Sequence, residues 1–132
     1  IERMERGQSE RLAPMVDAIL KDSAILYADL GRVVTTIGPG GFTGLRIGLS
    51  MALALGMALD IPVAGVRVTD TIAHDVIKKN NGLKNNLVVV IETKRSDFYV
   101  HEFKSDGQPA SDCGIMDFDA LHDHYRGRAV AW

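Results

Sequence analysis

Residues 37–48 read Ile37-Gly38-Pro39-Gly40-Gly41-Phe42-Thr43-Gly44-Leu45-Arg46-Ile47-Gly48. An apolar run over residues 33–37 precedes these glycines, and a longer apolar segment follows them as far as Leu59. This order predicts a strand, a tight turn and a helix. Because backbone N–H groups at the start of a helix attract anions, Gly38, Gly40 and Gly41 are candidates for a phosphate cradle.

Three details of the same segment weaken the nucleotide interpretation. Pro39 has no N–H to donate to a phosphate. No Lys-Ser or Lys-Thr pair follows, as a P-loop requires. A dinucleotide-binding fingerprint would place its third glycine at position 43, where Thr43 stands. The pattern therefore favours a turn that packs a helix close to a sheet, with a dinucleotide-binding module as the alternative.

The composition is that of a folded domain without a strong charge bias. The 132 residues are 46% hydrophobic, which suffices for one domain or two small lobes. A formal net charge of −2 argues against strong direct binding of nucleic acid, which needs a basic face. The single Cys113 cannot form an internal disulfide, which fits a reducing, cytoplasmic compartment.

The longest apolar stretch, Ile47 to Leu59, is broken by Gly48, Ser50 and Gly56. Its 13 residues are too few to span a bilayer, so we expect a buried helix and no membrane contact. The charged N-terminal residues do not resemble a signal peptide. Both ends of the chain look cut from something longer.

Hydrophobic periodicity predicts alternating helices and strands. Ser9 is the expected cap of a first helix that ends near Lys21, and Thr69 or Asp70 the expected cap of a third. The helix after the glycine turn is apolar nearly all round and should be covered on most sides. The full set of predicted elements is a helix at 9–21, a strand at 33–37, a helix at 43–59, a strand at 61–66, a helix from 69 or 70, a hairpin of strands at 87–91 and 98–103, and a short helix at 117–125.

Residues 35–49 closely resemble the signature of the TsaB (YeaZ) family, the dimerisation subunit of the bacterial machinery that makes threonylcarbamoyladenosine in tRNA. Relatives of this family, such as TsaD (Gcp), have carried the label M22 glycoprotease. Three further segments agree with the resemblance, which covers residues 6 to about 104. They are Arg6–Pro14, Ile61–Val66 and Ile91–Tyr99.

The resemblance implies an α/β, actin/Hsp70-like ATPase fold related to RNase H, with two lobes. The family's first strands come before its first helix, so this chain should lack the N-terminal strands and the C-terminal part. Residues 1–80 would belong to the N-terminal lobe and residues 81–132 to the start of the second, with the boundary somewhere in 66–86.

The catalytic paralogue TsaD holds a metal with two histidines four positions apart, just after the strand that follows its glycine turn. By resemblance the matching positions here are Val68 and Ile72, and neither side chain can bind a metal ion. The resemblance thus implies no catalytic residue, no metal site, and no cofactor bound by this chain alone. ATP or ADP would enter only in the assembled complex.

The implied function is that of a non-catalytic, cytoplasmic partner that supports transfer of threonylcarbamoyl to adenosine of tRNA. The implied partners are TsaD and the complex ATPase TsaE, with self-association as a further outcome. Docking in the family uses the first helix and the glycine-turn helix. The interface residues expected here are Leu12, Met15, Val16, Ile19, Leu49 and Leu53.

Other polar groups give weaker signals. His74 lies one helical turn from Asp70, a spacing more typical of a local hydrogen bond than of a ligand pair. The segment 122–124, His-Asp-His, is more typical of a solvated acidic turn than of a metal site. Arg46, inside an apolar helix, should pair with an acid or extend its charge to solvent. The alternative to a non-catalytic partner is an independent ATP-dependent enzyme or metallopeptidase.

Overall fold

The structure, a computed structural model, describes residues 7–126, and the chain divides into two compact units. Of the described residues, the first unit comprises 7–37 together with Gly41–Val66, and the second comprises Gly38–Gly40 and 67–126. The division after Val66 lies at the lower end of the range 66–86. The helix at 68–79, which we had assigned to the first lobe, packs in the second unit.

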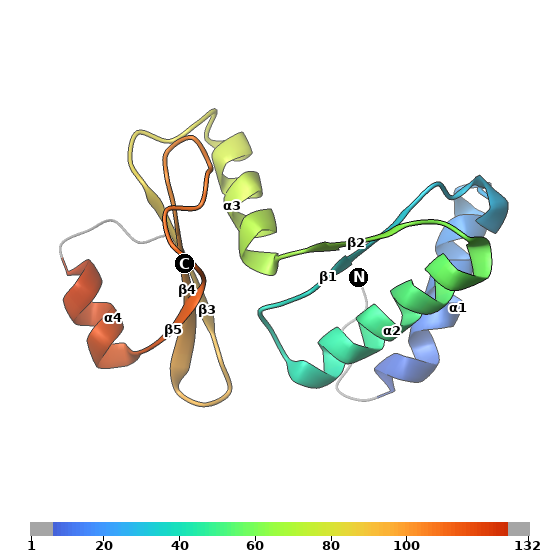
Figure 1. Cartoon of the computed structure of the whole chain (residues 1–132), viewed down its shortest axis with the longest axis horizontal. Helices are drawn as coiled ribbons and strands as arrows, with labels where there is room; N and C mark the ends of the chain where they lie inside the picture. Colours follow the sequence, from blue (N-terminus) through green and yellow to red (C-terminus); the bar gives the residue numbers. More distant parts are fainter. Residues whose placement is uncertain (1–6, 127–132) are drawn as a thin grey trace. The chain divides into compact units, whose positions relative to one another are not determined.

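The first unit is a strand–turn–helix–strand motif with an additional helix. Its parallel strands β1 and β2 pair in register from Val33 opposite Val63 to Thr36 opposite Val66. Helix α2 lies along these strands and α1 lies beside α2 (Figure 1). The element bounds are α1 Gln8–Asp22, a 3-10 helix η1 Tyr27–Asp29, β1 Val33–Thr36, α2 Phe42–Leu59 and β2 Val63–Val66.

Small residues allow α2 to approach its sheet closely. Gly48, the buried Ala52 and Gly56 recur every four positions, so they lie on one face of the helix. A Cβ at Gly48 would lie 3.7 Å from Thr35 Oγ1, whereas a Cβ at Gly56 would lie only 2.3 Å from Val63 Cγ2. Glycine is therefore required at position 56 by the packing of the helix on β2.

The prediction that α2 is covered on most sides is wrong for the part of the chain that the structure describes. Only Ala52 and Gly56 of this helix are buried. The sheet covers one side and α1 packs against another, but a stripe of large apolar side chains stays open to solvent. Its members are Phe42, Leu49, Leu53 and Met57.

The second unit is an antiparallel sheet with a helix on each face. The sheet has the order β3-β4-β5, and the hairpin of β3 and β4 is the predicted one. Figure 1 shows α3 and α4 on opposite sides of this sheet. The bounds are α3 Val68–Lys79, β3 Leu87–Glu92, β4 Asp97–Phe103, β5 Gly114–Asp117 and α4 Phe118–Tyr125.

Alternation along β3 builds two separate cores. Leu87 and Val89 point to the α3 side, where they cluster with Ala73 and Phe103. Val88 points to the other side and clusters with Val100, Leu121 and Tyr125. Strand side chains alternate between faces, so one apolar run serves both helices. Ala73 and Val76 of α3 thus find their partners in the second unit, which is why this helix packs there.

The helix starts differ from the predicted ones. Gly7, in the left-handed conformation, precedes α1 in place of a Ser9 cap, and Arg67 precedes α3 in place of Thr69 or Asp70. Neither start has a side-chain cap. By contrast Asp117 caps α4, since its Oδ1 accepts a hydrogen bond of 2.8 Å from Ala120 N–H. Strand β5 was not predicted.

Candidate functional site

The glycine turn connects β1 to α2. Gly38 has φ 108°, a left-handed value that favours glycine, and its peptide bond to Pro39 is cis. The Gly38 carbonyl accepts a hydrogen bond of 2.8 Å from the Val68 N–H at the start of α3. Gly41 precedes α2 and no side chain caps that helix. The structure thus places Gly38, Gly40 and Gly41 in one turn, and phosphate binding there stays a prediction.

The predicted interface residues lie on the two helices of the first unit. Ile19 of α1 is 61% exposed, and Leu53 and Leu49 of α2 are 48% and 37% exposed. Leu12, Met15 and Val16 of α1 are half-buried. No residue of α1 is fully buried. We call these six residues the α1–α2 face.

A groove of about 410 Å³ runs between α1 and α2. Its lining residues are Ser9, Leu12, Arg46, Ile47, Ser50 and Met51. Of the two outcomes expected for Arg46, pairing with an acid is not found within residues 7–126, and the residue is exposed to solvent. Its guanidinium instead lies 3.9 Å from the ring centroid of Phe42, one helical turn earlier. Such a contact is a cation–π interaction.

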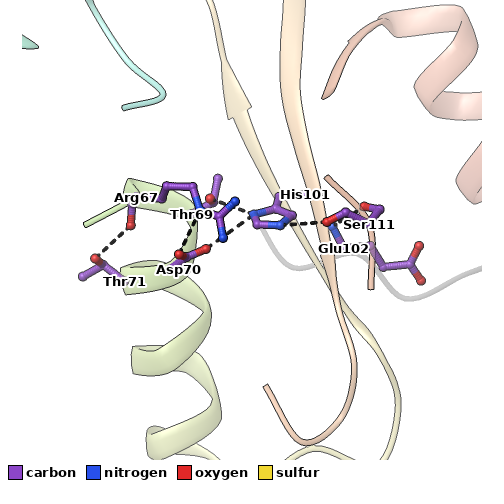
Figure 2. Close-up of polar contacts among 7 residues, drawn as sticks. All are labelled: Arg67, Thr69, Asp70, Thr71, His101, Glu102 and Ser111. Carbon is purple, nitrogen blue, oxygen red and sulfur yellow. Dashed lines mark hydrogen bonds and ion pairs between the residues drawn. The ribbon is translucent and has the colours of Figure 1, made fainter. Parts of the chain in front are cut away.

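A polar network in the second unit was missed by sequence reasoning (Figure 2). His101 of β4 is fully buried, with Nδ1 2.8 Å from Thr69 Oγ1 and Nε2 3.1 Å from the carbonyl oxygen of Ser111. Arg67 Nε donates to Asp70 Oδ2 at 2.9 Å. The signal was present in the alternation of β4, which places His101 between Tyr99 and Phe103 on the same face of the strand.

The hydrogen-bond partners fix the roles of the two ring nitrogens of His101. A carbonyl can only accept, so Nε2 must carry a proton toward Ser111. In the neutral ring Nδ1 then accepts from the hydroxyl of Thr69, which is itself fully buried. Asp70 Oδ1 lies 3.6 Å from Nδ1 and is buried without a hydrogen-bond partner among the residues described. The network therefore ties the first turn of α3 to β4 and to the segment before β5.

Cys113 lies near this network and is half-buried. Burial raises the pKa of its thiol, and the carboxylate of Asp70 raises that pKa further, while the guanidinium of Arg67 opposes both. A raised pKa keeps the sulfur protonated at neutral pH, which disfavours a nucleophilic role.

Removing the imidazole should destabilise the fold more than removing an exposed hydroxyl. We expect His101→Leu in the full-length protein to lower the free energy of unfolding by about 1–3 kcal/mol, because the buried Thr69 hydroxyl loses its partner. Urea denaturation measures this change. Thr71→Val, which removes an exposed hydroxyl bonded to the Arg67 carbonyl, should change stability by less than about 0.5 kcal/mol. Equal effects of the two variants would contradict the assigned role of His101.

Comparison with known proteins shows which family this chain belongs to. Residues 2–128 match the family model described as TsaD, tRNA N6-adenosine threonylcarbamoyltransferase. Relatives named tRNA threonylcarbamoyladenosine biosynthesis protein TsaB match as well. The Escherichia coli protein is 31% identical over 76% of this chain and 43% of its own length, and the Bacillus subtilis protein is 37% identical over 53% and 31%. The chain belongs to the TsaD/TsaB (YeaZ) family.

An uncharacterized protein of Mycobacterium tuberculosis is 44% identical over 71% of this chain and 41% of its own length. The chain thus spans less than half the length of these relatives. A solved structure of YeaZ from Pseudomonas aeruginosa superposes with a TM-score of 0.76 at 22% identity, over 99% of this chain and 59% of that chain. The TsaB (YeaZ) fold, of the actin/Hsp70-like class, is therefore confirmed.

Positions 68 and 72 of α3 are the ones that the resemblance matches to the two metal-binding histidines of TsaD. Both hold hydrocarbon side chains: Val68 opens α3 half-buried, and Ile72 is 38% exposed. His74 makes no ion pair with Asp70, whose oxygens face Arg67 and His101. Over residues 7–126 we find no group of three or more His, Cys, Asp or Glu side chains arranged to hold a metal ion.

Among residues 7–126, one helix is long and apolar enough to cross a membrane. Helix α2 has 18 residues and thus extends beyond the 13-residue apolar stretch Ile47–Leu59. Its mean hydropathy is 1.6, and 11% of the window is buried. A single such helix is weak evidence, because length and composition alone decide the test. In this family fold the same helix packs on β1 and β2 by its small-residue side.

Proposed function

We propose that the protein containing this chain is a non-catalytic partner of a metal-bearing TsaD paralogue in threonylcarbamoyladenosine synthesis. It acts in the cytoplasm and docks through the α1–α2 face. Within the assembled complex, TsaE supplies the ATPase and a nucleotide can occupy the glycine turn at Gly38, Gly40 and Gly41. Without its partner the protein self-associates through the same two helices.

The observation that carries this proposal is the open α1–α2 face. Helices of a globular unit normally bury their large apolar side chains. Here Ile19 of α1 and both Leu49 and Leu53 of α2 are exposed, although the two helices pack against each other. Exposed apolar patches of this kind mark protein interaction sites. A TsaD paralogue is the proposed partner, because a tRNA N6-adenosine threonylcarbamoyltransferase of Erythrobacter litoralis is 39% identical over 46% of this chain and so shares part of its sequence.

The non-catalytic assignment rests on the first turns of α3. Valine and isoleucine at positions 68 and 72 offer no lone pair to a metal ion, and zinc-type or iron-type sites need nitrogen, oxygen or sulfur ligands. The nearby Thr69, Asp70 and His101 are engaged with one another or with Arg67. The proposal is therefore that the fold is used for contact and the paralogue supplies the chemistry.

Reconstitution tests the proposed function. Threonylcarbamoyl transfer to tRNA would be measured with the TsaD paralogue and TsaE of the same organism, with and without the full-length protein. We expect transfer to depend on the protein, and the protein alone to be inactive. Metal-dependent transfer, or ATP turnover by the purified protein alone, would favour the independent enzyme instead.

A further inference from the structure

Helix α2 has one charged residue, and it lies on the exposed face. Arg46 is the only Asp, Glu, Lys or Arg among residues 42–59. It falls within the exposed stripe at helical spacing, between Phe42 and Leu49, and it lines the groove against α1. Together with the four apolar members of the stripe, Arg46 and Ser50 are the exposed polar residues on this side of α2.

The guanidinium of Arg46 is held but not neutralised. It lies over the ring of Phe42, a residue that is 67% exposed, and among residues 7–126 it forms no ion pair with a carboxylate. Stacking leaves the edge of a guanidinium open for two parallel hydrogen bonds, and it limits the side-chain entropy lost on binding. Arginine and aromatic residues are also the types most enriched among residues that dominate binding energy.

We propose that Arg46 determines which partner the α1–α2 face accepts; this inference rests on the proposed function. The occupant is a helix of the TsaD paralogue whose apolar side chains fill the groove and whose Asp or Glu pairs with the Arg46 guanidinium. A guanidinium that loses water without gaining a carboxylate makes binding unfavourable. A purely apolar helix is therefore rejected, because it would bury this charge unpaired.

The test uses the full-length protein and the TsaD paralogue of the same organism. Arg46→Met removes the charge and keeps the length of the side chain, and we expect it to weaken the complex about 30-fold or more. Arg46→Lys keeps the charge but lacks the planar guanidinium, so its affinity for the paralogue should lie between that of the unmodified protein and that of Arg46→Met. Calorimetry at 50 and 300 mM NaCl should also show a smaller salt dependence for Arg46→Met than for the unmodified protein. Arg32→Met, an exposed arginine outside both helices, is the matched control and should bind normally.

A charge swap identifies the carboxylate. Arg46→Glu should abolish binding, and one Asp→Arg or Glu→Arg change on the docking helices of the paralogue should restore it. If Arg46→Met binds with unchanged affinity and salt dependence while aspartates at Ile19 and Leu53 abolish the complex, the role of Arg46 is overturned and the proposed function stands. Loss of self-association alone in Arg46→Met, with normal affinity for the paralogue, would also overturn it. Failure of the unmodified protein to bind would end both proposals.

Discussion

The double variant Ile19→Asp/Leu53→Asp of the full-length protein should bind the TsaD paralogue at least about 100-fold more weakly than the unmodified protein. Each aspartate would place an unpaired charge in a contact that we infer to be apolar. An unpaired buried charge costs about 3 kcal/mol or more, which corresponds to a loss of affinity of about 100-fold. Both side chains are exposed, so the unbound fold should tolerate the changes. Light scattering or calorimetry on the mixed proteins measures the effect.

Ile115→Asp is the matched control for this pair. Ile115 of β5 is 62% exposed, close to the 61% of Ile19, but it lies in the second unit. It should leave the affinity for the paralogue unchanged. Undiminished binding by the double variant, or equal weakening by Ile115→Asp, would show that the α1–α2 face is not the docking surface.

Gly56→Ala should lower the free energy of unfolding of the full-length protein by about 1–3 kcal/mol. The new Cβ would lie 2.3 Å from Val63 Cγ2 and 3.1 Å from the backbone oxygen of Ile61. Neither the short, branched Val63 side chain nor a backbone carbonyl yields easily, so α2 must move away from β2. Denaturant unfolding measures the loss.

Gly44→Ala on the same helix is the control, with the opposite expected sign. A Cβ at Gly44 meets nothing within 4 Å, so the substitution should stabilise the protein by about 0.5–1 kcal/mol through the higher helix propensity of alanine. If Gly56→Ala stabilises the protein as much as Gly44→Ala does, the close contact of α2 with β2 is not as described.

Much of the fold was predictable because it depends on local patterns. The glycine turn between apolar segments predicted β1 and α2, the next apolar run predicted β2, and the apolar run before an alternating one predicted the hairpin of β3 and β4. Strand β5 was missed because Gly-Ile-Met-Asp is four residues long and begins with glycine, so its existence depends on pairing with β4. The predicted caps were wrong because Ser9 lies inside α1, which begins at Gln8, and because the side chains of Thr69 and Asp70 bond His101 and Arg67 in place of the start of α3.

The candidate site was predictable only in part. The family resemblance assigned the residues of the α1–α2 face, whereas periodicity alone could not tell which apolar side of α2 stays exposed. That side follows from Gly48, Ala52 and Gly56, which turn the small face to the sheet. The network of Thr69, Asp70 and His101 joins residues far apart in the chain, so no local sequence motif predicts it.

Hydrogen–deuterium exchange of the full-length protein, with and without the TsaD paralogue, tests the central claim most directly. The claim predicts slower exchange in peptides covering α1 and α2 when the paralogue is present, and unchanged exchange in peptides covering β4 and β5. Protection confined to the strands of the second unit, with the two helices unaffected, would contradict it.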